Sequence, residues 1–564
     1  MKNFIKSAGI LCCIMLLAGV FRLYNTNWDQ DQHLHPDERF LTMVGNAMQL
    51  PPTFLSYLDP QVSQFNPGNN NQRFFVYGTF PLIFNKVIAL VLHTDTYTLF
   101  TLQGRILSGI CDLFVVLLVF VTASLLRKKE HLHPSVPYFA SFFYALSVLP
   151  IQLSHFFTVD TFLNMFLVAT FYFLLRFYYN RKHWEVILAA LLFGLAVACK
   201  ISAIYLLPLF LLLLILPYFL KTDGKFHAKT YIFSHIHSFL FIVTTFFIVT
   251  YIATRLANPY LFETANFLNP TINSNFIASI KELRSWEGID IWFPPAVQWM
   301  TKPPIIYSFT NLLFYSLGIV QSLAIVIGTY VLLRHQRRLL LFVLLTFCLC
   351  FFLYQSLQFS KPMRYFLPLF PFLALIGGIG TDYISRRFHK AICGVFIILL
   401  LIHPLAYFSI YLHKNTRVAA SEWIYKNLPQ TDRILAEHWD DPLPFLLEEN
   451  YGKRFVIDQL PVFDPDTPEK WDKMRQLLEN DDYLVLSSNR GWGSIPTVPQ
   501  KYPTMTVFYQ NLLANRLSYK KIQEFTNYPS LRYLGIPITF PDDNADESFT
   551  VYDHPKVILF KHER

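Results

Sequence analysis

The chain has 564 residues, of which 53% are hydrophobic and only 15% are charged. A soluble domain carries about 25% charged residues, so this composition is typical of an integral membrane protein. The net charge of +9 does not indicate nucleic-acid binding, because lysines and arginines recur in short clusters between apolar runs. The seven cysteines form no Cys-x-x-Cys pair, so neither a disulfide framework nor a cysteine zinc site is expected.

Apolar runs long enough to cross a membrane recur from the N-terminus to about residue 412. A helix needs about 20 apolar residues to cross the hydrocarbon core. We predict an uncleaved span at 7–24 rather than a signal peptide, because many apolar segments follow it. The other single spans are predicted at 105–126, 136–153, 161–179, 231–254, 308–333, 339–357, 366–385 and 391–412.

The apolar stretch from Glu185 to Leu220 is too long for one span, at about 54 Å if fully helical. Its flanks, "NRKH" and "KTDGK", are both basic, and loops rich in Lys and Arg stay in the cytoplasm. Two flanks on the same side require two short spans that turn near Lys200. The sequence therefore predicts a polytopic α-helical membrane protein with about eleven transmembrane helices.

This arrangement places the basic clusters on one side of the membrane. They lie at 2–6, 127–129, 181–182, 221–229, 334–338 and 386–390. We therefore predict a multi-pass protein of the cytoplasmic (inner) membrane with a cytoplasmic N-terminus. The opposite face receives the loops 25–104 and 255–307 and everything after about residue 413. Within the first loop, "PLIFNKVIALVLH" is too short to cross and is expected to form an interfacial helix.

After residue 413 the pattern changes to alternating helices and strands. "RVAASEWIYKNL" and "PEKWDKMRQLLEN" predict helices, whereas "RILAEHW", "RFVIDQL", "DYLVLSS" and "SFTVYDHPKVILFK" predict strands. We predict two domains: a transmembrane domain at 1–412, which includes both external loops, and an extracytoplasmic α/β domain at 413–564. The sequence shows no internal repeats, so it lacks the paired inverted halves of many transporters.

Ionisable residues at the ends of spans are costly and indicate function when they gather on one side of the membrane. The predicted outer face receives Asp37, Glu38, His155, Asp160, Lys200, Arg255, Lys361 and Arg364. This mixture suits sugar transfer from a lipid-linked phosphate, because a carboxylate can deprotonate the acceptor while cations hold the departing phosphate. Nucleotide sugars are cytoplasmic, so a transferase on the outer face needs a donor carried by a lipid.

Several segments carry a resemblance to a known family. "HPDERF", "FVYGTFPL", "GRILSGICD", "SHFFTVDTF", "GLAVACKISAIYLLP" and "RYFLPLFPFLAL" resemble bacterial polyprenyl-phosphate-sugar-dependent glycosyltransferases related to protein O-mannosyltransferases and lipid A aminoarabinose transferases. These have the GT-C fold and are similar to glycosyltransferase family 39. "NPYLF", "PPAVQW", "TRVAASEWIY", "EHWDDPLP", "LSSNRGWGSI" and "ESFTVYDHPK" are similar to a prokaryotic subgroup, so the resemblance extends over nearly the whole chain.

The resemblance implies that Asp37 is the catalytic base and that Asp160 orients the substrate or supports the first carboxylate. Glu38 is the third candidate catalytic residue. The candidate substrate-binding residues are Arg364, Lys200, His155, Tyr77 and Arg105. The expected reaction is an inverting single displacement in which a sugar leaves its polyprenyl-phosphate carrier for an extracytoplasmic acceptor: a protein, a lipid or a surface glycan. One departure from the family is that aminoarabinose transferases carry a Lys in the segment where this chain has Gly78 and Thr79.

Simpler explanations stay open for these residues. Asp37, Glu38 and Asp160 suit helix N-termini, where acidic side chains are favoured. Lys200 and Arg364 suit cationic anchors at the membrane surface. No metal site is predicted, although a divalent cation remains open, since the spacing of the acidic and histidine residues in "HLHPDE" matches no known ligand pattern.

Two other classes of protein compete with the enzyme. The first is a transporter or flippase of a lipid-linked sugar or anionic glycolipid, which would need charges along a path to both faces of the membrane. The second is a non-catalytic membrane scaffold that presents the C-terminal domain, in which charges on separate segments would be unrelated.

Overall fold

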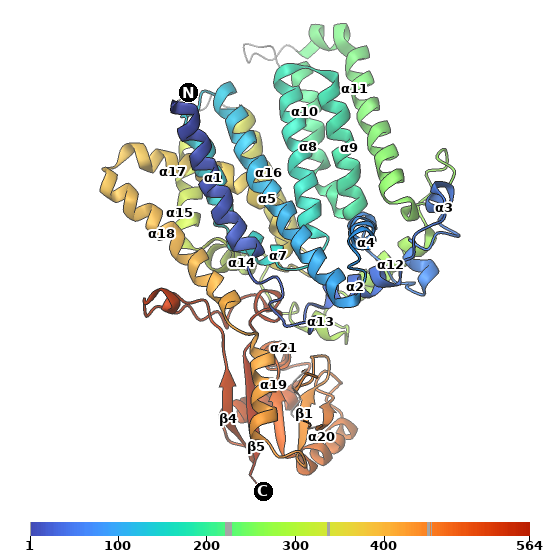
Figure 1. The fold of residues 1–564 in the computed structure, drawn as a ribbon, viewed down its shortest axis with the longest axis vertical. Helices are drawn as coiled ribbons and strands as arrows, with labels where there is room; N and C mark the ends of the chain where they lie inside the picture. The colour runs from blue at the N-terminus through green and yellow to red at the C-terminus, as the bar shows by residue number, and fades with distance from the viewer. Residues whose placement is uncertain (1, 220–227, 335–338, 448–451, 453, 564) are drawn as a thin grey trace.

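A bundle of long helices stands on a smaller domain built around a β-sheet (Figure 1). The computed structural model describes residues 2–219, 228–334, 339–447, 452 and 454–563. The predicted basic clusters at 221–229 and 334–338 lie almost entirely outside these residues. The fold is that of a multi-span helical membrane protein with a C-terminal sheet, as predicted.

The bundle contains helices or bent helix pairs at every predicted span. They are α1 (Lys2–Leu23), α5 (Tyr97–Lys129), α6 (Val136–Ala145), α7 (Val148–Ser154), α8 (Asp160–Asn180), α9 (His183–Cys199), α10 (Leu207–Phe219), α11 (Ala228–Ala257), α14 (Ile306–Asn311), α15 (Ile319–Arg334), α16 (Leu339–Ser356), α17 (Phe370–Arg387) and α18 (Lys390–Phe408). Among the described residues, 6 helices are long and apolar enough to cross a membrane, or up to 8 if each bent pair is one span. Shorter apolar helices at Ala8–Leu23, His183–Cys199 and Leu341–Ser356 occupy the other predicted spans.

The long apolar stretch after Glu185 is divided at the predicted point. Helix α9 ends at Cys199, the 3-10 turn Ile201–Leu206 follows, and α10 continues to Phe219. Lys200 has an extended backbone (φ −162°, ψ 131°), which breaks the helical hydrogen bonding between the two helices. The turn therefore holds a cation at the end of the bundle that faces the C-terminal domain.

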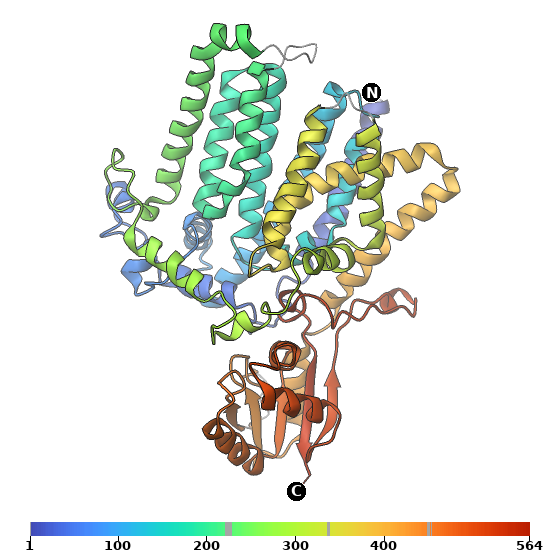
Figure 2. The same ribbon diagram turned by 180° about the vertical axis from the view of Figure 1, so that it is seen from behind.

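Short helices from the two predicted external loops collect at this same end of the bundle. They are α2 (Pro36–Ala47), α3 (Phe54–Leu58), α4 (Phe80–Leu92), α12 (Ser274–Ser285) and α13 (Pro294–Val297). Figure 2 shows the 255–307 segment crossing this end, between the bundle and the sheet domain. Helix α4 corresponds to the predicted interfacial helix.

The C-terminal domain has a five-stranded mixed sheet in the order β2-β1-β3-β5-β4. Its elements are α19 (Thr416–Asn427), β1 (Arg433–Glu437), β2 (Val456–Leu460), α20 (Pro468–Asn480), β3 (Tyr483–Leu486), α21 (Arg490–Ser494), α22 (Pro503–Leu513), β4 (Tyr519–Phe525), α23 (Glu547–Thr550) and β5 (Val557–His562). Strands β2 and β3 pair parallel to β1, whereas β5 is antiparallel to β3 and β4. Alternate strand residues pack into two separate apolar clusters, so helices cover both faces of the sheet.

One strand of the sheet was not predicted from the sequence, and another is shorter than predicted. Strand β4, "YKKIQEF", lies at the sheet edge and is rich in charged residues, so it lacks the apolar pattern of a buried strand. The predicted late strand is shorter than expected, because Glu547–Thr550 forms a helical turn and only Val557–His562 is extended. The residues between them reach the bundle instead of the sheet.

His554 joins the two domains through a buried charge cluster. Its Nδ1 lies 2.5 Å from Asp553 and its Nε2 2.8 Å from Asp542. Asp553 also accepts hydrogen bonds from the hydroxyls of Tyr407 and Tyr411, each at 3.0 Å. Burial alone would lower the pKa of His554, but the two carboxylates raise it to about 10. The imidazolium is therefore the charged centre of the domain junction.

The charged cluster around His554 predicts that the protein loses stability at alkaline pH. Because folding raises the pKa of His554 from 6.5 to about 10, its contribution is fully present below pH 6.5 and is lost as the pH rises through 10. We expect the thermal midpoint of the purified protein to fall over this interval, and His554→Gln to remove most of the slope. The exposed His413→Gln variant is the control; an unchanged slope in His554→Gln would contradict the assignment.

Candidate functional site

Helix α2 begins inside the motif "HPDERF" for three local reasons. The Nδ1 of His35 accepts a hydrogen bond from the backbone N–H of Glu38, at 3.3 Å, and so caps the helix. Pro36 occupies the first turn, where its fixed φ is favourable and its missing N–H costs nothing. Burial lowers the pKa of His35 to about 3, so the ring stays neutral and keeps this acceptor. The cap directs Asp37 to the surface of the bundle.

Asp37 forms an ion pair with Arg364, which lies 327 residues away at the start of the α17 segment. Burial would raise the pKa of Asp37, but Arg364 and, more weakly, His35 and Lys200 lower it to about 2. Arg364 binds Asp37 through Nη1, and its buried Nε has no partner among the described residues. The arginine therefore keeps a free donor beside the carboxylate.

A second ion pair lies next to the first. Lys200 Nζ is 2.9 Å from Asp160 Oδ1, and it lies 4.9 Å from the centre of the Tyr365 ring. The guanidinium of Arg364 is 5.6 Å from the same ring, so one aromatic ring contacts both cations. The Tyr77 hydroxyl belongs to this group as well, because burial and then the nearby charge of Asp37 raise its pKa.

Asp37, Arg364 and Tyr365 line a cavity of about 480 Å³ between the bundle and the C-terminal domain. One wall comes from the 255–307 loop and includes Trp286, Phe293 and Trp299. The opposite wall comes from the C-terminal domain and includes Trp439, Asp440, Arg490, Glu547 and Tyr552. Asp160, Lys200 and Tyr77 are not in the lining, but Lys200 contacts the ring of Tyr365, which is. The cavity is a closed-in, aromatic site with acidic and basic groups facing each other.

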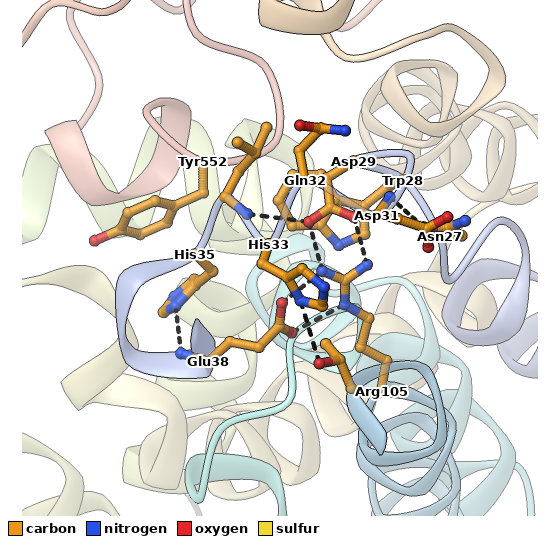
Figure 3. Close-up of polar contacts among 12 residues, drawn as sticks. Asn27, Trp28, Asp29, Asp31, Gln32, His33, His35, Glu38, Arg105 and Tyr552 are labelled. Carbon is orange, nitrogen blue, oxygen red and sulfur yellow. Dashed lines mark hydrogen bonds and ion pairs between the residues drawn. The ribbon is translucent and has the colours of Figure 1, made fainter. Parts of the chain in front are cut away.

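Glu38 and Arg105 lie in a buried network instead of the cavity (Figure 3). Arg105 binds Glu38 at 2.5 and 2.9 Å and Asp29 at 2.7 and 2.9 Å, and its remaining N–H donates to the carbonyl of Thr26 at 2.8 Å. Glu38 also accepts from the backbone N–H of Phe157 at 2.7 Å. All five guanidinium donors have acceptors, so Arg105 has no free donor for a substrate.

His155 also lies outside the cavity, as a fully buried side chain. Both of its ring nitrogens contact backbone carbonyls, of Ile151 at 2.9 Å and Tyr24 at 3.0 Å. Its ring stacks on Tyr411 with centroids 3.7 Å apart. These contacts describe a packing residue that joins α1, α7 and the end of α18.

The histidines and carboxylates of "HLHPDE" do not converge on a metal position. His33 contacts the Thr101 hydroxyl at 3.2 Å, whereas His35 caps α2 and Glu38 faces Arg105. Within the residues that the structure describes, no group of three or more His, Cys, Asp or Glu side chains could hold a metal ion.

Five residues of the cavity wall were not predicted from the sequence as site residues. They are Tyr365, Trp439, Arg490, Glu547 and Tyr552. All lie inside segments that resemble the family, but composition and spacing do not distinguish a cavity aromatic from a core aromatic. Burial raises the pKa of Glu547 to about 7, although Arg490 lies 3.1 Å from it and opposes the shift.

One known protein family matches part of the helical bundle. Residues 99–253, from α5 into α11, match the family described as dolichyl-phosphate-mannose-protein mannosyltransferase. No curated protein matches the sequence of this chain.

Two solved structures are similar to this chain at low identity. Oligosaccharyltransferase AglB from Archaeoglobus fulgidus, in complex with an inhibitory peptide and a dolichol-phosphate, has 10% identity and a TM-score of 0.49, over 94% of this chain and 75% of its own. ArnT from Cupriavidus metallidurans bound to undecaprenyl phosphate has 13% identity and a TM-score of 0.46, over 98% of this chain and 97% of its own.

The buried network predicts that Arg105 stabilises the folded protein. Arg105→Met leaves Asp29 and Glu38 buried without a counter-charge, so we expect it to lower the free energy of unfolding by about 3–5 kcal/mol. Thermal unfolding in detergent measures this effect. The matched control is Arg73→Met, which removes an exposed arginine from the segment that also contains Asp29 and Glu38. This variant should unfold like wild type. Equal stability of the two variants would show that the network is dispensable.

Proposed function

We propose that the cavity transfers a sugar from a polyprenyl-phosphate carrier to an extracytoplasmic acceptor, with inversion at the anomeric carbon. The Asp37–Arg364 pair carries this proposal. A carboxylate suited to accept a proton and a cation suited to hold a phosphate lie in contact, in a cavity at one end of a membrane bundle. The family match of residues 99–253 supports the same chemistry.

The donor phosphate binds the guanidinium of Arg364, whose Nε is free for a second hydrogen bond. Lys200 contacts the same Tyr365 ring as Arg364 and adds positive charge near the phosphate. As the phosphate takes over Arg364, Asp37 loses the partner that keeps its pKa low. Donor binding thereby converts Asp37 from a salt-bridge carboxylate into a stronger base.

Asp37 then accepts a proton from the acceptor hydroxyl or amine, whose oxygen or nitrogen attacks the anomeric carbon opposite the phosphate. The bond from that carbon to the phosphate oxygen breaks, and polyprenyl phosphate leaves with the electron pair. One displacement inverts the anomeric centre, so a single base suffices and no sugar–enzyme bond forms. Asp160 holds Lys200 in place through their 2.9 Å ion pair.

The surroundings of Gly78 support Lys200 as the second phosphate ligand. The N–H of Gly78 donates to the carbonyl of Cys199 at 2.9 Å, directly before Lys200. A Cβ at position 78 would lie 1.9 Å from the carbonyl oxygen of Ala198, so no side chain fits there. The buried Thr79 hydroxyl donates to Asn258 at 2.8 Å. This segment supplies no cation, and Lys200 provides one beside it.

We also propose that the cavity end of the bundle faces away from the cytoplasm, in the cytoplasmic membrane. The basic residues at 127–129 and 386–387 end helices α5 and α17, and the N-terminus of α1 lies at the opposite end of the bundle from the cavity (Figure 1). The positive-inside rule then assigns the cavity to the outer surface.

Asp37→Asn tests the base directly. The amide keeps the shape of the side chain but cannot accept the proton, so we expect transfer from a labelled lipid-linked sugar to fall by about 10²–10⁴-fold. The protein should fold normally and still bind the donor. Asp31→Asn changes an exposed acid six residues earlier in the same loop and should retain full transfer. Full transfer by Asp37→Asn would exclude Asp37 as the base.

The release of Asp37 from Arg364 predicts two different pH profiles. In the free enzyme Asp37 titrates at about 2, so kcat/KM for the donor shows no acid limb from this group above pH 3. In the donor complex its pKa is higher, so kcat falls on acidification at a higher pH than kcat/KM does.

The control for these profiles is Arg364→Gln. Without the guanidinium, burial raises the pKa of Asp37 already in the free enzyme. The acid limbs of kcat and kcat/KM should therefore converge in this variant. Initial rates at limiting donor measure kcat/KM, and those at saturating donor measure kcat. If the two acid limbs of the wild-type enzyme coincide, the proposed release of Asp37 from Arg364 is contradicted.

A further inference from the structure

A second hollow of about 420 Å³ adjoins the cavity on the side of the C-terminal domain. Gln298 and Glu547 line both spaces, so the two are neighbours. The second hollow is lined mostly by residues around 489–497 and 543–547. The mechanism proposed above uses none of them. A ligand whose reacting end lies at Asp37 would have room to continue into this hollow.

Trp439 is a residue of the C-terminal domain that lines the cavity, and its backbone conformation there is strained. Its side chain is 40% exposed, and its φ of 82° is a strained value for a bulky residue. Both following residues are tied down: Asp440 binds Arg417 at 2.8 Å, and Asp441 binds Arg39 twice at 3.0 Å. Packing does not require an indole in this position, because much of it faces open space.

The support for Trp439 comes from the helix that carries Asp37. Arg39 lies two residues after Asp37 in α2 and also donates to the carbonyl of His33 at 2.9 Å. The Arg39–Asp441 pair therefore fixes the distance between the indole and the proposed base. Phe293 of the opposite wall contacts the Trp439 ring edge to face, with centroids 5.4 Å apart.

Two residues that line the second hollow carry polar atoms without partners. Asn489 Oδ1 and Trp492 Nε1 are buried, and neither has a hydrogen-bond partner among the described residues. An unpartnered buried donor or acceptor costs about 1–3 kcal/mol. One acceptor and one donor in the same hollow match a ligand that carries hydroxyl groups, since a hydroxyl can donate and accept.

The acidic groups on this side of the site are already neutralised. Asp440, Asp441 and Glu547 each pair with an arginine, namely Arg417, Arg39 and Arg490. Because these three carboxylates are already paired, they offer no free negative charge to a cationic acceptor. An exposed indole next to hydroxyl-binding groups instead suits a neutral molecule with apolar ring faces and polar edges.

We propose that the Trp439 side of the cavity and the adjoining hollow form the acceptor-binding site, and that the acceptor is a neutral oligosaccharide. This inference rests on the proposed function, and it specifies the class of acceptor. The accepting sugar stacks on Trp439 beside Asp37. The following sugars extend past Glu547 and hydrogen-bond to Asn489 and Trp492.

Saturation-transfer NMR on the full-length protein in nanodiscs tests acceptor binding independently of catalysis. The probes are cellohexaose, maltohexaose, chitohexaose and a serine- and threonine-containing hexapeptide. We expect at least one hexasaccharide to receive saturation from the wild-type protein and the hexapeptide to receive none. Trp439→Ala, and the double variant Asn489→Leu with Trp492→Phe, should each weaken the signal about fivefold.

Three controls make the result specific. Trp439→Phe keeps an aromatic face and should retain most of the signal. Trp184→Ala removes an equally exposed indole from α9 and should leave the signal unchanged. Asp31→Asn changes an exposed acid outside the cavity and should also leave the signal unchanged. Thermal unfolding identifies any variant that loses binding by misfolding.

The outcomes separate this inference from the proposed function. If no hexasaccharide binds, or if binding survives both Trp439→Ala and the double variant, the oligosaccharide site is excluded even when Asp37→Asn abolishes transfer. Binding of the hexapeptide that depends on Trp439 would identify a peptide acceptor and overturn the carbohydrate assignment. If hexasaccharides bind through Trp439 but Asp37→Asn keeps full transfer, the acceptor site stands and only the proposed base is excluded.

Discussion

The buried guanidinium of Arg105 is the interaction on which the functional end of the molecule depends. It extends from a bundle helix, α5, and binds two carboxylates of the segment between α1 and α5, Asp29 and Glu38. A buried charge is costly unless its donors are satisfied, so the loop has to fold around this side chain. Glu38 is the immediate neighbour of Asp37, and Arg105 thereby sets the position of the proposed base. Two adjacent carboxylates thus take different roles: one anchors the loop and the other faces the cavity.

The same principle of paired charges extends through the site. Asp37 faces Arg364, Asp160 faces Lys200, and Asp441 faces Arg39. In a site bounded by apolar helices each unpaired charge would be unstable, so the resting protein holds its reactive groups in mutual contact. In the proposed mechanism the donor phosphate takes over Arg364, and Asp37 is left as the unpaired carboxylate that accepts the proton.

The sequence predicted the bundle well because membrane spans are long, apolar and bounded by basic residues. The turn at Lys200 followed from its two basic flanks, and strands β1, β2 and β3 followed from their apolar alternation. The edge strand β4 was missed because "YKKIQEF" shows no buried face. For the site, topology brought Asp37, Asp160, Lys200 and Arg364 to one end, but it also brought Glu38, Arg105 and His155. Only three-dimensional contacts separate these groups, because a buried salt bridge and a phosphate ligand use the same residue types.

The order of strands in the C-terminal sheet has a consequence for how the molecule is made. Strand β5 is the last in the chain, yet it lies inside the sheet, between β3 and β4. Tyr552, which completes the cavity wall, comes just before it. During synthesis the helices enter the membrane long before these residues leave the ribosome. The cavity is therefore assembled last, because its wall is complete only after Tyr552 has been made and β5 has entered the sheet.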